Sequence, residues 1–245
     1  GTIAQDAPII PVSAHHDVNL DVLIQAIEDI IPTPDRSSSQ PGLMYVARSF
    51  DVNRPGSRPD KLQGGIVGGS IVEGSFSVGD SILIAPGRRV QSGGKSTWDP
   101  IRTTIESVKG GGIGLKTVHA GGLCGIATPM DPVSTKADEL SGQVMAREGE
   151  LPPVWESLDL DLQLLEKMVS TDEDDAGEIR PLQPNEMLMV NSATATSVGT
   201  VSSIKGTSAT LQLRLPICAK RGSRITLSRR IGSRWRLIGH GSIAG

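Results

Sequence analysis

Histidine and cysteine side chains could bind a metal ion, and the chain has four of the first and two of the second. His15 and His16 are adjacent, and neighbouring side chains on a strand or helix point apart, so the two do not normally share one ion. Neither an H-x-x-x-H nor a C-x-x-C spacing adds a second pair of ligands. Cys124 and Cys218 each lie in an apolar stretch, which is typical of buried, reduced thiols. We therefore expect no metal site.

Glycine-rich segments could cradle a phosphate group, but the chain contains no G-x-x-x-x-G-K-[ST] loop with the lysine that contacts a nucleotide. The segments 65–69 and 109–114 are rich in glycine, yet neither leads into a helical pattern. We interpret them as turns and close approaches of strands. A G-x-S-x-G elbow is also absent from the sequence, so we predict no catalytic residue in this chain.

Arginine and lysine could bind phosphate groups, although the net charge of −3 argues against a generally basic nucleic-acid binder. From Pro216 onward the printed sequence holds no acidic residue, and its basic residues are Lys220, Arg221, Arg224, Arg229, Arg230, Arg234 and Arg236. We interpret this run either as the solvated face of a strand or as a surface for phosphate or a partner. Trp235 is expected to point into the core while Arg234 and Arg236 face water.

The elements that must position these residues begin with an α/β pattern. The apolar run 8–12 predicts a buried strand, and Ser13 opens a turn. Helical spacing follows at Leu20, Leu23, Ile24, Ile27 and Ile31. Asn19 or Asp17 is placed to cap the first turn of this helix, whose apolar stripe needs a sheet to cover it. The prolines 32 and 34 end the helix, and residues 35–42 are typical of a linker.

Beyond this linker the pattern predicts strands separated by glycine-rich turns. The first group is 44–50, 65–73, 81–84, 101–108 and 122–128, and the second is 158–164, 187–190, 198–204, 210–215, 224–227 and 235–239. The composition changes around 131–149, between the two groups. Leucines alternate with polar residues over 158–164, as in a strand with one buried face. Strands at this spacing suggest closed barrels or sandwiches.

Several stretches resemble translational GTPases. The segment PVSAHHDVNLDVLIQAIEDIIPTPDR is similar to their last guanine-recognition element, in which a strand ends in a Ser-Ala turn and a helix follows. The segment KLQGGIVGGSIVEGSFSVGD carries the glycine pattern of their second domain. More selectively, MYVARSFDVNRPGS, NEMLMVN and ITLSRRI resemble the gamma subunit family of archaeal and eukaryotic translation initiation factor two. The resemblance covers essentially the whole chain, and the short loops are like those of archaeal members.

This resemblance implies a mainly β fold, in which two consecutive β-barrel domains are preceded by the last strand and helix of an α/β GTPase domain. The expected divisions are a remnant of the GTP-binding domain at 1–36, barrel domain II at 37–134 and barrel domain III at 135–245. The phosphate loop, both switch regions and the Asn-Lys-x-Asp element of the family are not in this sequence. We therefore expect that this chain alone neither holds nor hydrolyses GTP.

The implied function is that of a translation initiation factor subunit, which binds initiator methionyl-tRNA and delivers it to the small ribosomal subunit. In the complete protein the cofactors would be GTP and Mg²⁺, and the partners would include the alpha and beta subunits, with beta bound mainly through the GTP-binding domain. We expect a cytoplasmic location and no membrane partner, because no apolar run in the sequence approaches the roughly 20 residues of a membrane helix.

The resemblance and the loop composition together give candidate site residues. Ser13, Ala14 and His15 would belong to the guanine-nucleotide site. Candidates for contact with tRNA are Arg48, Arg54, Arg58 and Lys61, although Arg48 could equally be a charge on a strand face. Asn53, Pro55 and Gly56 are candidates for docking a partner subunit, because a polar loop with two prolines is exposed and stiff. Two alternatives remain open: a related carrier of tRNA, such as the selenocysteine-specific elongation factor, and a β-barrel scaffold that only docks proteins.

Overall fold

The computed structural model describes residues 5–34, 36, 39–167 and 177–244. The chain divides into two compact units, residues 1–35 and residues 36–245, and each is described by itself. Within the described residues, no helix has both the length and the apolar character needed to cross a membrane.

The predicted helix of the first unit is confirmed as α1, Leu20–Ile30. Asn19 occupies the N-cap position, but its backbone is left-handed and its side chain does not cap the helix. Its amide instead donates a hydrogen bond to the carbonyl of Pro11 at 2.9 Å, so the expected cap is wrong. No residue of α1 is buried, and Ile24 exposes 61% of its surface. The apolar stripe predicted from the sequence is therefore present and uncovered within this unit.

The strand predicted at 8–12 does not form. This segment has no strand assignment, and Ile9 is 95% exposed. A strand needs hydrogen bonds from a neighbouring extended segment. Among residues 5–34 the only strand-like pairing is a single bridge between Ser13 and Val18. Among the described residues of this unit, the apolar segment 8–12 therefore has no neighbouring extended segment with which to pair as a strand.

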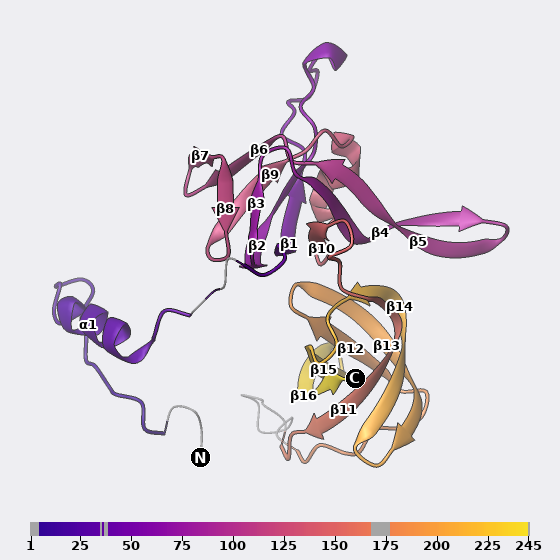
Figure 1. Cartoon of the computed structure of the whole chain (residues 1–245). Helices are drawn as coiled ribbons and strands as arrows, with labels where there is room; N and C mark the ends of the chain where they lie inside the picture. The colour runs from indigo at the N-terminus through magenta and orange to yellow at the C-terminus, as the bar shows by residue number, and fades with distance from the viewer. Residues whose placement is uncertain (1–4, 35, 37–38, 168–176, 245) are drawn as a thin grey trace. The chain divides into compact units, whose positions relative to one another are not determined.

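The second unit begins with an eight-stranded sheet in the order β5-β4-β10-β1-β2-β9-β6-β7 (Figure 1). Its strands are β1 Leu43–Phe50, β2 Ile66–Glu73, β4 Ser81–Ser92, β5 Lys95–Thr104, β6 Ser107–Gly110, β7 Ile113–Leu115, β9 Leu123–Ala127 and β10 Val144–Arg147. A separate pair, β3 Ser75–Ser77 and β8 Thr117–His119, and two 3₁₀ helices, η1 Pro59–Lys61 and η2 Pro132–Asp138, complete this part. All the neighbouring strands pair antiparallel.

This sheet curls without a complete ring of hydrogen bonds between its described strands. Its order has two ends, β5 and β7, yet only residues 105 and 106 separate β5 from β6 near the other end. The curl encloses fully buried side chains, which include Met44, Ile71, Phe76 and Ile126. The first predicted barrel is therefore a strongly curved sheet around a core.

Two glycine-rich segments behave as the sequence indicated. A Cβ atom on Gly69 of β2 would lie 2.0 Å from the carbonyl oxygen of Tyr45 on β1, so only glycine permits this close approach of the strands. Gly111 and Gly112 have positive φ angles and join β6 to β7 in a two-residue turn. Neither segment leads into a helix in the structure.

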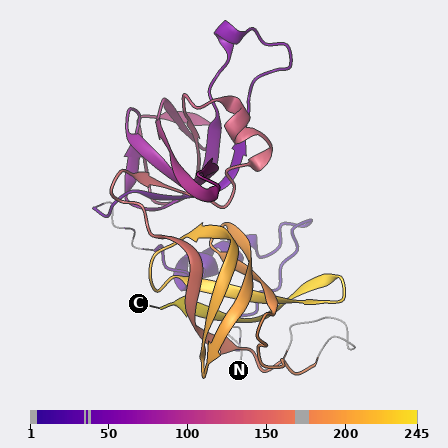
Figure 2. The same ribbon diagram turned by 90° about the vertical axis from the view of Figure 1, so that its right-hand side faces the viewer.

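The second barrel closes completely, in the order β11-β14-β13-β12-β15-β16 (Figure 2). Its strands are β11 Val154–Leu164, β12 Met187–Ser192, β13 Ala195–Lys205, β14 Ser208–Cys218, β15 Arg224–Ile231 and β16 Arg234–Ile243. Leu158 and Leu160 are fully buried while Asp159 and Asp161 are exposed, as the alternation predicted. The inward faces of the strands supply one continuous core.

The predicted inward position of Trp235 is wrong, because Trp235 is 37% exposed. The register of β15 and β16 shifts between the pairs Leu227–Gly239 and Ser228–Leu237, which leaves Ile238 as an extra residue on β16. Ile238 is fully buried, so the alternation beyond this bulge is reversed. Trp235 and Leu237 consequently face outward.

The interpretation of the basic run as one surface fails at Arg229, which is only 4% exposed. Its guanidinium forms an ion pair with Glu186, from Nε to Oε1 at 2.5 Å. It also donates to the carbonyls of Arg180 at 2.9 Å and Pro181 at 3.3 Å. Arg229 is therefore an internal structural cation, whereas Arg230 beside it on β15 is exposed.

The change from the first sheet to the second barrel falls later than the expected boundary at 134/135. That boundary assigns β10 to the second barrel domain, but β10 pairs with β1 and β4. The composition change around 131–149 marks η2, a connection inside the first sheet. The change of sheet lies between the end of β10 and the start of β11.

A small apolar cluster joins the two sheets. Leu43, Ala85 and Val144 of the first pack with Cys218 of the second. An ion pair between Lys220 and Glu73, 2.5 Å from Nζ to Oε2, joins the segment after β14 to the end of β2. Burial raises the pKa of the Cys218 thiol to about 12, which agrees with the inert, buried cysteine expected from the sequence.

Replacing Arg229 with methionine is predicted to destabilise the second barrel by about 3 to 5 kcal/mol, because the carboxylate of Glu186 would remain without its buried partner. Urea unfolding followed by far-ultraviolet circular dichroism measures this change. The matched control is Arg230→Met on the same strand, where exposure predicts a change within about 0.5 kcal/mol. Equal shifts for the two variants would contradict the structural role of Arg229.

Candidate functional site

The Ser13 segment forms a compact turn in the first unit. The amide of Val18 donates to the Ser13 carbonyl at 3.1 Å, and the Ser13 amide donates to the Val18 carbonyl at 3.2 Å. A third bond joins the amide of His16 to the same Ser13 carbonyl. Ala14 and His15 lie exposed at the tip, and no described residue accepts a hydrogen bond from their amides. The turn therefore presents two backbone N–H groups that are available to a ligand.

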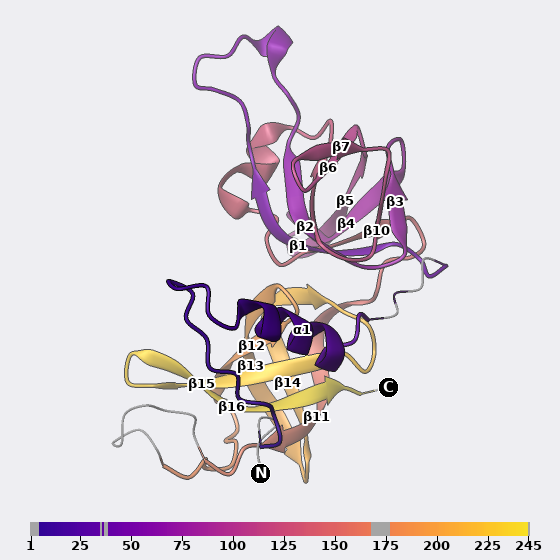
Figure 3. The same ribbon diagram turned by 90° about the vertical axis from the view of Figure 1, so that its left-hand side faces the viewer.

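The loop from Asn53 to Gln63 projects from the first sheet (Figure 3). The side chain of Asn53 closes the base of this loop. The side-chain Nδ2 of Asn53 donates to the backbone carbonyl of Gln63 at 2.8 Å. Its side-chain Oδ1 accepts from the backbone amide of Gln63 at 2.8 Å. Asp51 holds Asn53 in turn, by accepting from its backbone and its side chain. Asn53 thus acts as the base of the loop, and its polar atoms are already satisfied.

The tip of this loop carries the other candidates. Pro55 and Gly56 are exposed, and a Cβ atom at Gly56 would meet only open space. Arg58 pairs with Asp60 at 3.0 Å on the surface, a contact of little net energy. The side chains of Arg54 and Lys61 form no hydrogen bond or ion pair with another described residue. Two cations on a closed loop are therefore available for an anionic partner.

Arg48 is placed differently from these three residues. It lies on β1, and its Nε donates to Asp138 Oδ1 at 2.8 Å, while the amide of Ser49 donates to the same oxygen at 3.0 Å. The Arg48 guanidinium and then the Ser49 amide lower the pKa of Asp138 below its usual value. The side chain of Arg48 remains largely exposed. Arg48 thus links β1 to η2, which agrees with its alternative interpretation as a strand-face charge.

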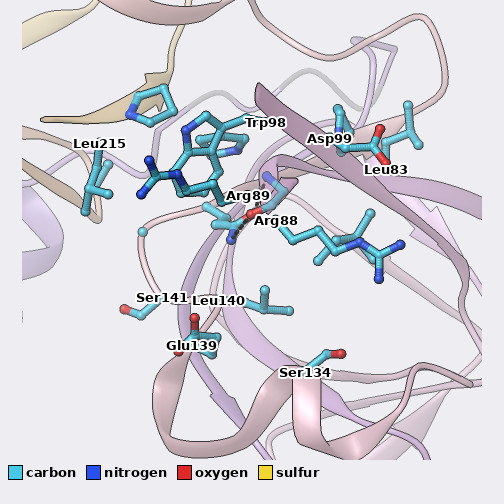
Figure 4. A pocket seen from close by; sticks show the side chains of 18 of the residues that line it. Leu83, Arg88, Arg89, Trp98, Asp99, Ser134, Glu139, Leu140, Ser141 and Leu215 are labelled. Carbon is cyan, nitrogen blue, oxygen red and sulfur yellow. Dashed lines mark hydrogen bonds between the residues drawn. The ribbon is translucent and has the colours of Figure 1, made fainter. Parts of the chain in front are cut away.

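One feature of the second unit was missed by sequence reasoning. A cleft of about 990 Å³ lies between the β4–β5 hairpin, η2 and the second barrel (Figure 4). Its walls include Arg88, Arg89, Trp98 and Leu215. The sequence pattern predicted β4 only to residue 84 and β5 only from residue 101, so it did not place these residues on paired strands. The available signal was the glycine pair 93–94 between polar, β-prone segments.

The described residues contain no group of three or more His, Cys, Asp or Glu arranged to hold a metal ion. His15 and His16 contact each other edge to face, with ring centroids 4.8 Å apart.

Comparison with known proteins finds archaeal relatives that are similar over the whole chain. The sequence profile described as "Initiation factor eIF2 gamma, C terminal" matches residues 156–243. Translation initiation factor 2 subunit gamma of Methanocaldococcus jannaschii is 49% identical over all 245 residues. Over its whole length the chain is similar to the family of translation initiation factor 2 gamma subunits. The Halorubrum lacusprofundi and Pyrococcus horikoshii members of this family are 45% and 47% identical over 244 and 243 residues. The chain spans 59% of the length of each of these relatives.

Among solved structures, the crystal structure of a bacterial selenocysteine-specific elongation factor resembles this chain with a TM-score of 0.70. The match covers 96% of this chain and 33% of the other, at 17% sequence identity. This likeness shows a shared fold. The sequence identity to the gamma subunits is much higher, at 49% for the Methanocaldococcus jannaschii protein.

Replacing Asn53 with alanine is predicted to open the loop, because two hydrogen bonds to the Gln63 backbone are lost at about 1 kcal/mol each. Arg54 and Arg58 both precede proline, where trypsin does not cut, so cleavage after Lys61 reports the opening. We expect roughly tenfold faster cleavage there, measured by mass spectrometry over a time course.

The control is Ser57→Ala, which removes one hydrogen bond at the tip, from Ser57 Oγ to the Arg54 carbonyl, and leaves the base intact. Trypsin should cut this variant after Lys61 at nearly the rate of the original chain. Cleavage of the Asn53 variant no faster than that of the control would show that Asn53 does not close the loop.

Proposed function

We propose that this chain serves translation initiation as the part of a gamma subunit that binds initiator methionyl-tRNA and docks partner subunits. The observation that carries the proposal is the 49% identity over the whole chain to a protein named translation initiation factor 2 subunit gamma. Delivery of the tRNA to the small ribosomal subunit, contacts with alpha and beta subunits, and GTP with Mg²⁺ belong to the proposal for the complete protein.

The geometry of the Asn53–Gln63 loop supports the proposed contact with tRNA. A loop closed at its base loses less conformational entropy on binding than an open loop of the same length. Arg54 and Lys61 are cations without a partner among the described residues, and Arg58 is held only by a surface pair. A phosphate group of an RNA would take the place of Asp60 beside Arg58 at a small cost in free energy. Arg48 lies at the end of β1 from which this loop leaves.

The Ser13 turn supports a contribution to guanine recognition. Its exposed amides at Ala14 and His15 are hydrogen-bond donors, and the guanine carbonyl is an acceptor. The proposed contribution is one edge of a nucleotide site, because the chain has no phosphate-binding loop. This chain alone would therefore show background GTP hydrolysis.

The proposal is tested by filter binding of methionylated initiator tRNA to this chain, across a series of salt concentrations. In the double variant Arg54→Glu/Lys61→Glu we expect weaker binding and a salt slope reduced by about 0.7 to 0.9 for each phosphate contact removed. Lys205→Glu, an exposed charge reversal on β13 in the second barrel, is the matched control and should leave the slope unchanged.

Three outcomes would count against the proposal, and two of them would favour an alternative. Absence of tRNA binding by both this chain and the complete protein would contradict it. A pull-down of other factor subunits without salt-dependent tRNA affinity would favour the docking scaffold. Tighter binding of selenocysteinyl-tRNA than of initiator tRNA would favour the elongation-factor alternative, whose fold this chain shares.

A further inference from the structure

The cleft between the β4–β5 hairpin and the second barrel is built around a glycine. Gly87 has a φ of 90°, and a Cβ atom there would lie 1.9 Å from the Asp99 carbonyl oxygen. The buried side chain of Gln143 clamps this glycine, since its oxygen accepts from the Gly87 amide at 2.8 Å and its amide donates to the Gly87 carbonyl at 3.1 Å. The hairpin therefore leaves the sheet at a fixed point.

The far wall of the cleft is fixed in the same way. Gly142, next to Gln143, approaches the turn between β12 and β13 so closely that a Cβ atom would lie 3.1 Å from Ala195 Cα. Leu215 of β14 lines the same wall and is 48% exposed. Its backbone exchanges two hydrogen bonds with the hydroxyl of Ser197, which hold this part of β14 against β13. The cleft is thus preformed between two constrained walls.

The hairpin presents different chemistry on its two faces. Arg89 pairs with Trp98 across the strands, and Arg88 pairs with Asp99, so each pair shares a face. Figure 4 shows Trp98 beside Arg89, on the side of the cleft where Leu215 lies, and Asp99 on the other side near Leu83. The half-buried indole and the Arg89 guanidinium therefore form one mixed apolar and cationic surface.

The Arg89 guanidinium has no hydrogen bond or ion pair with any residue that the structure describes. Arg88 has none either, whereas Arg102 in the same cleft pairs with Glu148. An arginine beside an indole has the composition of a binding hot spot in protein interfaces, and the exposed leucine adds apolar surface next to them. Its fork of donors matches a carboxylate in two-bond geometry.

We propose that this cleft docks an extended segment of a partner protein, in which an acidic side chain pairs with Arg89 and an apolar side chain packs on Trp98 and Leu215. This site is separate from the proposed tRNA contact on the Asn53–Gln63 loop. Charge complementarity to Arg89 selects the acidic residue, and the apolar wall selects its neighbour.

The overall charge of the cleft favours a protein segment over an RNA strand. Three cations, Arg88, Arg89 and Arg102, line it together with three anions, Asp99, Asp131 and Glu139. A strand of RNA needs an excess of cations along its phosphates. A protein segment needs only one carboxylate near Arg89 and can leave the acidic wall uncontacted.

To test this proposal, peptides that bind the full chain are selected from a display library of random short sequences. We expect enriched sequences that combine an acidic and an apolar residue. The peptides selected in this way should bind the Arg89→Glu variant about 30-fold more weakly than the original chain. Binding to the Trp98→Ser variant should be weaker by a similar factor. Trp98→Phe should retain most of the affinity. Selection repeated on Arg89→Glu should enrich basic residues in place of acidic ones.

Arg54→Glu in the loop is the matched control, because it should impair tRNA binding while leaving peptide selection unchanged. Failure of the proposed tRNA contact and failure of the cleft are therefore distinguishable. No enrichment, or enriched peptides that bind all variants equally, would overturn the docking site. Binding of oligouridylate that depends on Trp98, without peptide binding, would also overturn it and assign the cleft to RNA.

Discussion

The alternation of inward and outward side chains along paired antiparallel strands is the constraint on which the rest of this structure depends. It places Leu158 and Leu160 in the core of the second barrel and the aspartates between them in water. Where a bulge inserts one residue, the alternation reverses, as it does after Ile238. The surface of the protein is therefore set by register as well as by residue type, and Trp235 lies outside although tryptophan is a common core residue.

Glycines determine where the strands approach one another, and so where the surfaces lie. At Gly69 the absence of a side chain lets β2 meet the carbonyl of Tyr45 on β1. At Gly87 it lets the β4–β5 hairpin turn away from the sheet, and the Gln143 carboxamide holds that turn. The first glycine serves the core, whereas the second creates the wall of a cleft. The same residue type thus has two physical roles, which only the neighbours of each glycine distinguish.

The sequence predicted the elements with strong periodicity and missed those that depend on distant neighbours. The helix at Leu20–Ile30 and the strand through Leu158 were predictable, because the spacing of apolar residues is local information. The strand at 8–12 was not, since composition cannot supply a pairing partner. The outer half of the β4–β5 hairpin was missed because it projects from the sheet and carries polar residues on both faces. Of the candidate site residues, Asn53 was predicted as a partner contact, and the structure adds a role that the sequence did not show, because its side chain closes the loop.

The position of a charge, more than the number of charges, separates structural from functional cations in this protein. The C-terminal run is the most basic part of the sequence, yet Arg229 within it is buried against Glu186 and two carbonyls. Desolvating that guanidinium is tolerable only because each of its three nitrogens donates to an internal acceptor, so it is bound internally and closed to a ligand. Arg54, Lys61 and Arg89 have the opposite environment, with rigid backbone beneath them and no internal acceptor among the described residues. When an external anion binds a cation on a fixed backbone, the cost is mainly the rotamer entropy of the side chain, because the backbone is already ordered. This is why the loop and the cleft, and not the arginine-rich end of the chain, are the surfaces best suited to recognition.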